Sequence, residues 1–171
     1  PHQDVEGKLY YILYPFKVGE GLKPSHTKVQ GIIVATTRPE TMLGDVAVAV
    51  NPKDRRYKKL IGKKLILPIM GRKIEIIADG FVDKKFGTGA VKVTPSHDSD
   101  DFEIAKRHGL QPITVMGPDG KMNENAGRFN GMDRFEARKQ IIAELEDKKL
   151  LVKIEKHDYA VGHCYRCHTV I

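Results

Sequence analysis

The sequence predicts a mixed, β-rich fold in which short strands are joined by turns and a few helices are interspersed. Short runs rich in Val, Ile and Leu, bounded by Gly, Pro, Asn or Asp, recur through the first two thirds of the chain, which is the pattern of strands joined by turns. Long helical patterns occupy only two stretches, and no internal repeat is present. Such a succession does not fit a regular βαβ array.

The strands are predicted first, in chain order. We expect them at residues 9–16, 29–36, 46–50, 64–68, 73–78, 89–94, 113–116 and 150–154. Met70–Gly71 is a suitable turn for a hairpin between the fourth and fifth of these strands. A short helix is predicted at 51–59, because Pro52 suits a first-turn position and charged helix formers follow it.

Two longer helices are predicted in the second half. Residues 98–108 begin with acids and end with bases followed by Gly109, as the helix dipole and a glycine stop require. Residues 132–149 carry Ala137, Ile141 and Leu145 at four-residue steps, which gives an apolar face for the core. The polar, Gly- and Asn-rich stretch 117–131 is predicted to be a loop long enough for binding or mobility.

Length and composition indicate one globular domain. The chain has 171 residues, of which 40% are hydrophobic and 30% charged, and no apolar run approaches the roughly 20 residues that cross a bilayer. It begins at Pro1 without signal-peptide features. We therefore expect a single domain, 1–171, cut from a longer protein, with about 1–8 and 155–171 as flanking connectors. Two cysteines suit a reducing compartment, and the cytoplasm is expected.

The charge balance permits a polyanionic partner. Lys and Arg number 29 against 22 Asp and Glu, giving a net charge of +7, enough to attract nucleic acid at long range. Arg55, Arg56, Lys58 and Lys59 surround Tyr57. Such a cluster can contact phosphates beside an aromatic ring, but a solvated helix face is the alternative interpretation.

The segment TTRPETMLGD, residues 36–45, concentrates polar groups at the end of a predicted strand. Pro39 ends that strand and forces a bend at Arg38. The bend lets hydroxyl groups converge, those of Thr36, Thr37 and Thr41. The alternative is a helix N-terminus, with Thr37 as N-cap and Glu40 completing a capping box.

A second segment, FGTGAVKVTPSHDSDDFE, covers residues 86–103 and joins a glycine turn, a strand and a helix start. Lys92 and Thr94 leave the same face of the strand because they are two residues apart. Asp98, Asp100 and Asp101 crowd the first helical turn. One interpretation is structural: Asp98 is the N-cap of the helix, and no function is needed. The other is that a cationic ligand relieves the repulsion among the three acids, because a helix needs only one cap.

Metal sites and common nucleophile motifs are weaker alternatives. His97, Asp98 and Asp101 are ordinary ligand types, although neighbouring side chains diverge. The cluster HCYRCH contains Cys164 and Cys167 at zinc spacing but lacks four separated ligands. It indicates half of a zinc site or a metal-free pair, and the sequence leaves zinc open. The chain contains neither a P-loop nor a Gly-x-Ser-x-Gly elbow.

Together, TTRPETMLGD and GTGAVKVTPSHDSDDFE resemble the editing domain inserted into the class I valyl-, isoleucyl- and leucyl-tRNA synthetases. The likeness extends over almost the whole chain, through LYYILYPF, NPKDRRYKKLIGKKLILPI, IIADGFVDKKFGTGA, NENAGRFNGMDRFEARK, LLVKIE and VGHCYRCHTVI. Lys92 after GTGAV and the pair Glu40–Thr41 favour the valyl branch. Ser96 departs from the alanine that this family carries before the His-Asp pair.

The resemblance implies a closed β-barrel with peripheral helices, acting without a cofactor on the acceptor 3′ end of tRNA(Val). The implied reaction is hydrolysis of a wrong amino acid from tRNA, threonine in the valyl branch, because threonine is isosteric with valine. A synthetic site cannot strongly reject such an isostere by binding alone, so these synthetases hydrolyse the wrong product at a second site. Whether threonyl adenylate is also cleaved stays open, and the remainder of the synthetase chain is an expected partner.

The resemblance also implies roles for individual residues. Asp101 matches the carboxylate that binds the substrate α-ammonium, and Arg38 and Phe86 match positions near the terminal adenosine. The remaining matches line the amino-acid pocket: Asp98, Thr94, Lys92 and Thr41. Because no nucleophile with an attendant base is apparent, we expect attack by a water positioned by Thr36, Thr37, Lys92 and backbone N–H groups.

Three alternatives accompany this hypothesis. An isoleucyl- or leucyl-type editing domain would act on another amino acid by the same chemistry. A catalytically silent tRNA-binding module would use only the basic surface. A metal-dependent hydrolase would use His97, Asp98 and Asp101.

Overall fold

The computed structural model describes residues 2–16, 31–162 and 166, with side chains at 7–16, 31–157 and 166. Its strands are β1 (His2–Pro15), β2 (Gly31–Thr36), β3 (Ala47–Val50), β4 (Lys64–Ile66), β5 (Lys73–Ala78), β6 (Ala90–Val93) and β7 (Leu151–Gly162). Its helices are the α-helices α1 (Ser99–Arg107) and α2 (Arg134–Asp147) and the 3₁₀ helices η1 (Pro39–Gly44) and η2 (Glu124–Phe129). The predicted mixed, β-rich fold is confirmed.

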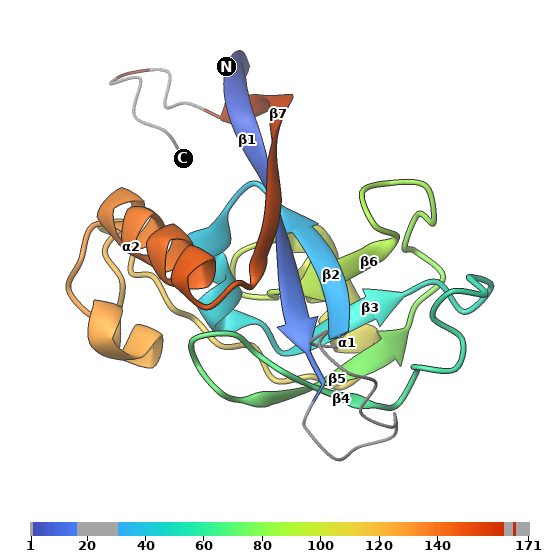
Figure 1. Cartoon of the computed structure of the whole chain (residues 1–171). Coiled ribbons are helices and arrows are strands. Elements are labelled where there is room, and N and C mark those ends of the chain that lie inside the picture. The colour runs from blue at the N-terminus through green and yellow to red at the C-terminus, as the bar shows by residue number, and fades with distance from the viewer. Residues whose placement is uncertain (1, 17–30, 163–165, 167–171) are drawn as a thin grey trace.

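The strands form two sheets. One has the order β2-β1-β7 and is antiparallel; the other has the order β4-β5-β3-β6, with a parallel β3/β5 pair between antiparallel neighbours. β1 and β7 pair along almost their entire length, from His2 opposite Gly162 to Ile12 opposite Leu151. Figure 1 shows this long two-stranded ribbon rising out of the body of the molecule.

The implied closed barrel is wrong for the residues that the structure describes, because their ladders form two separate sheets. Between β2 and β6 the connection is a side chain: Thr88 Oγ1 donates to the Ile33 carbonyl oxygen at 2.6 Å. Gly87 and Gly89 have φ values of 55° and 77°, so the backbone turns there and cannot extend a ladder beside β2. Between β1 and β4, an isolated bridge joins Phe16, which directly follows β1, to Leu65 of β4.

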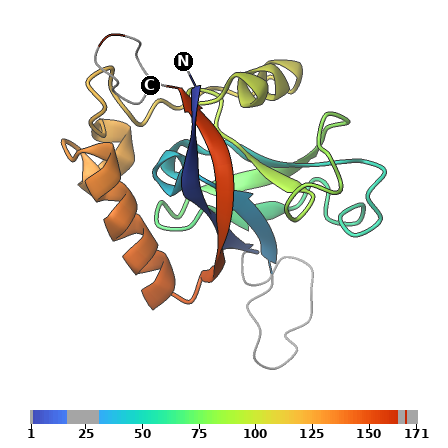
Figure 2. The ribbon, with the colours of Figure 1, turned by 90° about the horizontal axis from the view of Figure 1, so that it is seen from above.

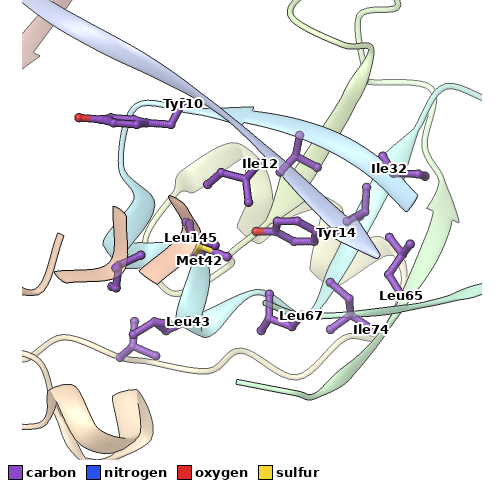
Figure 3. Close-up of a cluster of buried hydrophobic side chains, with 14 of the residues drawn as sticks. Tyr10, Ile12, Tyr14, Ile32, Met42, Leu43, Leu65, Leu67, Ile74 and Leu145 are labelled. Atoms are coloured by element: carbon purple, nitrogen blue, oxygen red, sulfur yellow. The ribbon is translucent and has the colours of Figure 1, made fainter. Parts of the chain in front are cut away.

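The core fills the space between the two sheets and α2. In β2, alternate residues Ile32 and Val34 are buried, as expected for a strand with one core face. Figure 3 shows the Tyr14 ring among aliphatic side chains from several elements. A smaller cluster joins Ile104 and Ala105 of α1 to the four-stranded sheet, and Figure 2 shows α1 and α2 well apart at the periphery of the strands.

Both predicted α-helices are confirmed. Ala137, Ile141 and Leu145 of α2 are fully buried at the predicted four-residue spacing. Asp98 is the N-cap of α1 and accepts hydrogen bonds from the backbone N–H groups of Asp100 and Asp101. Among the described residues, no helix combines the length and apolar character that crossing a membrane requires.

Three predicted elements are wrong. Residues 113–116 form no strand and contribute one bridge, Met116 to Met122. Residues 51–59 form turns, because the side chains of Asn51 and Asp54 accept from backbone N–H groups two residues later and so compete with a helix. The predicted loop 117–131 contains η2. The last strand is also longer than 150–154, since β1 supplies a partner as far as Gly162.

Replacing Asp133 by Ala should lower the free energy of unfolding by about 1 kcal/mol. Asp133 is the N-cap of α2, and its Oδ1 accepts from the N–H groups of Phe135 and Glu136 at 2.8 and 3.4 Å. Urea unfolding at constant m-value measures the change. Asp147→Ala, at the opposite end of the same helix, is the control and should cost nothing, because an acid there opposes the dipole. Equal losses in both variants would contradict the capping role.

Candidate active site

A cavity of about 530 Å³ opens where the end of β2, strand β6, helix α1 and the loop before β6 meet. Its polar wall is formed by side chains from segments that are distant in sequence: Thr36, Thr37, Arg38, Lys92, Asp98, Asp100 and Asp101. Its apolar wall includes Leu9, Val91 and Ile104, and its rim carries Phe81 and Phe86. A cavity that combines an apolar wall with a few converging polar groups is the usual form of a ligand site.

Asp101 is the buried acid of this cavity. It lies in the first turn of α1, is 6% exposed, and accepts a hydrogen bond from the Thr94 N–H at 2.8 Å. Burial raises the pKa of Asp101 to about 6, against the opposing effects of the Lys92 ammonium and the Thr94 N–H. At neutral pH the site therefore holds a poorly solvated carboxylate that a cation would stabilise.

Lys92 is the only lysine among the cavity-lining residues that the structure describes, and it is 8% exposed. Its Nζ donates to Thr94 Oγ1 and lies 3.7 Å from Asp45 Oδ1. Thr94 Oγ1 donates to Asp45 Oδ1 at 2.5 Å, and the Tyr14 hydroxyl donates to Asp45 Oδ2 at 2.6 Å. Asp45 thus anchors a buried network that fixes the lysine at the cavity wall.

Burial raises the pKa of the Asp45 carboxyl, and Lys92, Thr94, Tyr14 and Arg72 oppose this effect. The Asp45 side chain is completely buried. A buried carboxylate is tolerated only when it is paired and hydrogen-bonded, and here both of its oxygens accept hydrogen bonds.

The bend after β2 is held by its own hydrogen bonds. The Arg38 N–H donates to Thr36 Oγ1 at 3.1 Å, and Thr41 Oγ1 donates to the Arg38 carbonyl oxygen at 3.0 Å. Arg38 Nη2 donates to the His97 carbonyl oxygen at 2.6 Å and lies 3.7 Å from Asp98 Oδ2. Arg38 therefore ties the bend to the start of α1 across the cavity.

The capping-box interpretation of this segment is wrong. The N-cap position of η1 is Arg38, without a side-chain cap. Glu40 instead pairs with Arg138 of α2, its two carboxylate oxygens accepting at 2.6 and 2.7 Å. Glu40 is 1% exposed, so this two-bond pairing compensates a buried charge.

The structure brings most of the predicted site residues together. Seven line the cavity: Thr36, Thr37, Arg38, Phe86, Lys92, Asp98 and Asp101. Thr94 and Thr41 do not line it; both are buried, and their hydroxyl groups bond within the protein. Thr94 contacts the site through Lys92 and through its N–H to Asp101.

The candidate metal set of His97, Asp98 and Asp101 is not assembled. His97 Nε2 accepts a hydrogen bond from the Val115 N–H at 3.0 Å, which leaves that nitrogen unavailable to a cation. In the part of the chain that the structure describes, no three His, Cys, Asp or Glu side chains are grouped for a metal ion. Cys164 and Cys167 lie outside the described residues, so their zinc prediction stays untested.

Sequence reasoning missed Asp45, Tyr14 and Phe81. Asp45 closes the quoted TTRPETMLGD run directly before a buried strand, and an acid at such a place signals a buried partner. Tyr14 lies in an ordinary alternating strand pattern, and nothing in that pattern indicates that its hydroxyl group donates to Asp45. Phe81 follows Gly80 in the loop between β5 and β6, and its exposure at the cavity is visible only in the structure.

Two solved structures have a fold similar to that of this chain. The fold is that of GlLeuRS-CP1, with a TM-score of 0.62 and 13% identity over 88% of this chain and 99% of that one. It also matches LeuRS of Agrobacterium radiobacter K84, solved as a ternary complex with tRNA and LeuAMS, with a TM-score of 0.59 and 18% identity over 99% of this chain and 24% of that one. The family model described as leucyl-tRNA synthetase, editing domain, matches residues 58–146.

The relatives found by sequence are valine–tRNA ligases. Valine–tRNA ligases of Carboxydothermus hydrogenoformans, Thermotoga maritima and Staphylococcus carnosus are 57%, 54% and 54% identical over 170 residues, 99% of this chain. The chain spans 18–19% of the length of these relatives. It belongs to the editing-domain family of the class I aminoacyl-tRNA synthetases, with valine–tRNA ligases as its relatives.

Proposed function

We propose that residues 1–171 act as the editing domain of a longer valine–tRNA ligase and hydrolyse the ester of mischarged threonyl-tRNA(Val). The observation that carries this proposal is the cavity in which the buried Asp101 carboxylate faces Lys92 and the hydroxyl groups of Thr36 and Thr37. The identity of 52–57% to valine–tRNA ligases supports the valyl assignment. ATP binding would belong to the rest of the ligase, and the cytoplasm is its proposed location.

Asp101 is suited to binding the α-ammonium of the aminoacyl group. Its carboxylate is buried beside an open cavity, with a backbone N–H on one oxygen. A charge-assisted hydrogen bond to such a group contributes about 1.5–3 kcal/mol. In a peptidyl or N-acylated aminoacyl ester the nitrogen at this α-carbon is an uncharged amide, so the contact favours an ester whose amino group is free.

Selection of threonine over valine would come from the polar wall. Asp98 and Lys92 line the cavity and can hydrogen-bond a substrate hydroxyl group, whereas valine offers them only a methyl group. A buried polar group left without its partner costs about 1–3 kcal/mol. Thr94 supports this selection indirectly, because it orients the Lys92 ammonium.

We infer that water attacks the ester carbonyl directly. Among the described residues that line the cavity there is no Ser, Cys or His, and no described hydrogen bond joins the hydroxyl group of Thr36 or Thr37 to a base that could activate it. The water oxygen bonds to the carbonyl carbon, the bond to the ribose oxygen breaks, and that oxygen takes up the proton. Threonine and intact tRNA are released. An acyl-enzyme trapped by rapid quench would contradict this route.

The test of the proposed function compares threonyl-tRNA(Val) with valyl-tRNA(Val) as substrates of this chain and of a ligase that contains it. Fast loss of threonine with slow loss of valine is expected. A panel of mischarged tRNAs separates the isoleucyl- and leucyl-type alternatives, because each would favour a different amino acid. If tRNA binds while both esters stay stable, the domain is a silent tRNA-binding module.

The pH dependence provides an independent check. Because the pKa of Asp101 is raised to about 6, the carboxylate that binds the ammonium is lost as the pH falls through 6. We expect kcat/KM for threonyl-tRNA to drop about tenfold per pH unit below 6, since this parameter reports the free enzyme. Asp101→Asn, which cannot titrate there, should lack this step. The same step in both proteins would assign it to another group.

A further inference from the structure

The loop 80–89 carries two exposed aromatic side chains at the rim of the cavity. Phe81 is 62% exposed and Phe86 is 56% exposed, and both line the cavity. Exposed apolar side chains gathered at the rim of a cavity commonly mark a binding surface. Phe86 is the ring that the resemblance places near the terminal adenosine, whereas Phe81 has no role in the proposed reaction.

Side chains of the segment 51–57 fix this loop by holding its carbonyl oxygens. The contacts are Asn51 Nδ2 to Val82 at 2.8 Å, Arg56 Nη2 to Lys84 at 2.8 Å, and the Tyr57 hydroxyl to Thr88 at 2.7 Å. Arg56 is itself held by both carboxylate oxygens of Asp54. The basic segment around Tyr57 therefore positions the loop, and Arg56 is committed to that task.

Asp79 joins the loop to α1. Its Oδ1 accepts from the Phe81 N–H at 2.9 Å, while its Oδ2 accepts from Arg107 Nε and Nη2 at 3.1 and 3.0 Å and contacts His108 Nε2 at 3.1 Å. α1 carries Asp101 in its first turn. The Phe81 backbone is thus tied to the same helix that carries the proposed ammonium ligand, so the backbone that carries the ring is positioned relative to that helix.

Charge around the two rings suits a nucleic acid. Lys84 and Lys85 are exposed and lie between Phe81 and Phe86 in the loop. Asp83 also lines the cavity, but its Oδ1 accepts from the Lys85 N–H at 2.9 Å. Aromatic faces next to lysines are the arrangement that binds single-stranded nucleic acid, with bases on the rings and phosphates on the cations.

We propose that Phe81 is a stacking platform for the penultimate nucleobase of the tRNA 3′ end. The proposal rests on the proposed function, in which Phe86 and Arg38 adjoin the terminal adenosine. A single-stranded end that places its last nucleoside in the cavity must leave it over the rim, and Phe81 is the second exposed ring there. Phe81 would then distinguish a 3′ end of two or more nucleotides from a lone aminoacyl nucleoside.

The test compares two esters, threonyl-adenosine and the threonyl ester of the dinucleotide CpA, with wild-type protein and Phe81→Leu. We expect Phe81→Leu to lower kcat/KM about tenfold for the CpA ester, equal to about 1.4 kcal/mol, and less than twofold for threonyl-adenosine. Phe81→Trp should retain the CpA activity. Phe102→Leu is the matched control, because Phe102 is 48% exposed on α1 and does not line the cavity.

Equal losses on both esters, or no loss on either, would overturn the stacking role. Direct binding of the uncharged trinucleotide CCA gives a readout that needs no hydrolysis, and Phe81→Leu should weaken it about tenfold while Phe102→Leu leaves it unchanged. If wild-type protein binds CCA in this Phe81-dependent way but hydrolyses neither ester, the editing function fails and the stacking role stands. If hydrolysis is fast and Phe81→Leu binds CCA as tightly as wild-type protein does, the stacking role is wrong and the editing function stands.

Discussion

Replacing Asp101 by Asn should lower kcat/KM for threonyl-tRNA hydrolysis by about 10- to 150-fold. The change removes the negative charge that binds the α-ammonium, a contact of about 1.5–3 kcal/mol. Asparagine keeps the size of the side chain and an oxygen for the Thr94 N–H, which the carboxylate accepts at 2.8 Å. The fold should therefore survive, and single-turnover hydrolysis measures the effect.

Glu103→Gln is the matched control for Asp101→Asn. Glu103 is an exposed acid on the same helix and does not line the cavity, so its loss removes the same unit of charge at a distance from the substrate. Hydrolysis should change less than threefold. Equal rates in wild-type protein and Asp101→Asn would contradict the ammonium-binding role and favour the silent tRNA-binding module.

Replacing Asp45 by Ala should destabilise the fold by about 3–5 kcal/mol, the range found when one partner of a buried ion pair is removed. The side chain is completely buried and accepts from the Tyr14 hydroxyl and from Thr94 Oγ1, with Lys92 Nζ 3.7 Å away. Alanine removes the carboxylate that lies 3.7 Å from the buried Lys92 ammonium, and it leaves the hydroxyl groups of Tyr14 and Thr94 without their acceptor. Urea unfolding measures the loss.

Asp83→Ala is the control for Asp45→Ala, because Asp83 is an exposed acid whose one described hydrogen bond is to the Lys85 N–H. It should change the free energy of unfolding by less than 1 kcal/mol. Asp45→Asn should fall between the two, since an amide oxygen can still accept from Tyr14. A loss below 1 kcal/mol for Asp45→Ala would contradict the role of Asp45 as the anchor of this buried network.

The elements that the sequence predicts well are those set by local pattern. The buried stripe of α2 and the Asp98 cap of α1 depend on spacing over a few residues. The failures depend on distant partners. β7 continues to Gly162 because β1 offers a pairing edge from the other end of the chain, and Glu40 has the sequence context of a local cap but pairs with Arg138 of α2.

The same division holds at the site. Asp101, Lys92 and the Thr36–Thr37 pair could be chosen from motifs, and the fold gathers them around one cavity. Asp45 could not be chosen in this way, because its role depends on Tyr14 and Thr94, which lie 31 and 49 residues away in sequence. The orientation of Thr94 likewise depends on this network, so a motif predicted its proximity to the site but not its burial.

One measurement joins the site to its proposed substrate: hydrolysis of threonyl-tRNA(Val) and of its analogue lacking the α-amino group, by wild-type protein and by Asp101→Asn. If the Asp101 carboxylate binds the ammonium, removing the amino group should slow the wild-type protein about 10- to 150-fold more than it slows Asp101→Asn. If both proteins lost the same factor, the carboxylate and the ammonium would act independently, and Asp101 would not be the residue that recognises the aminoacyl group.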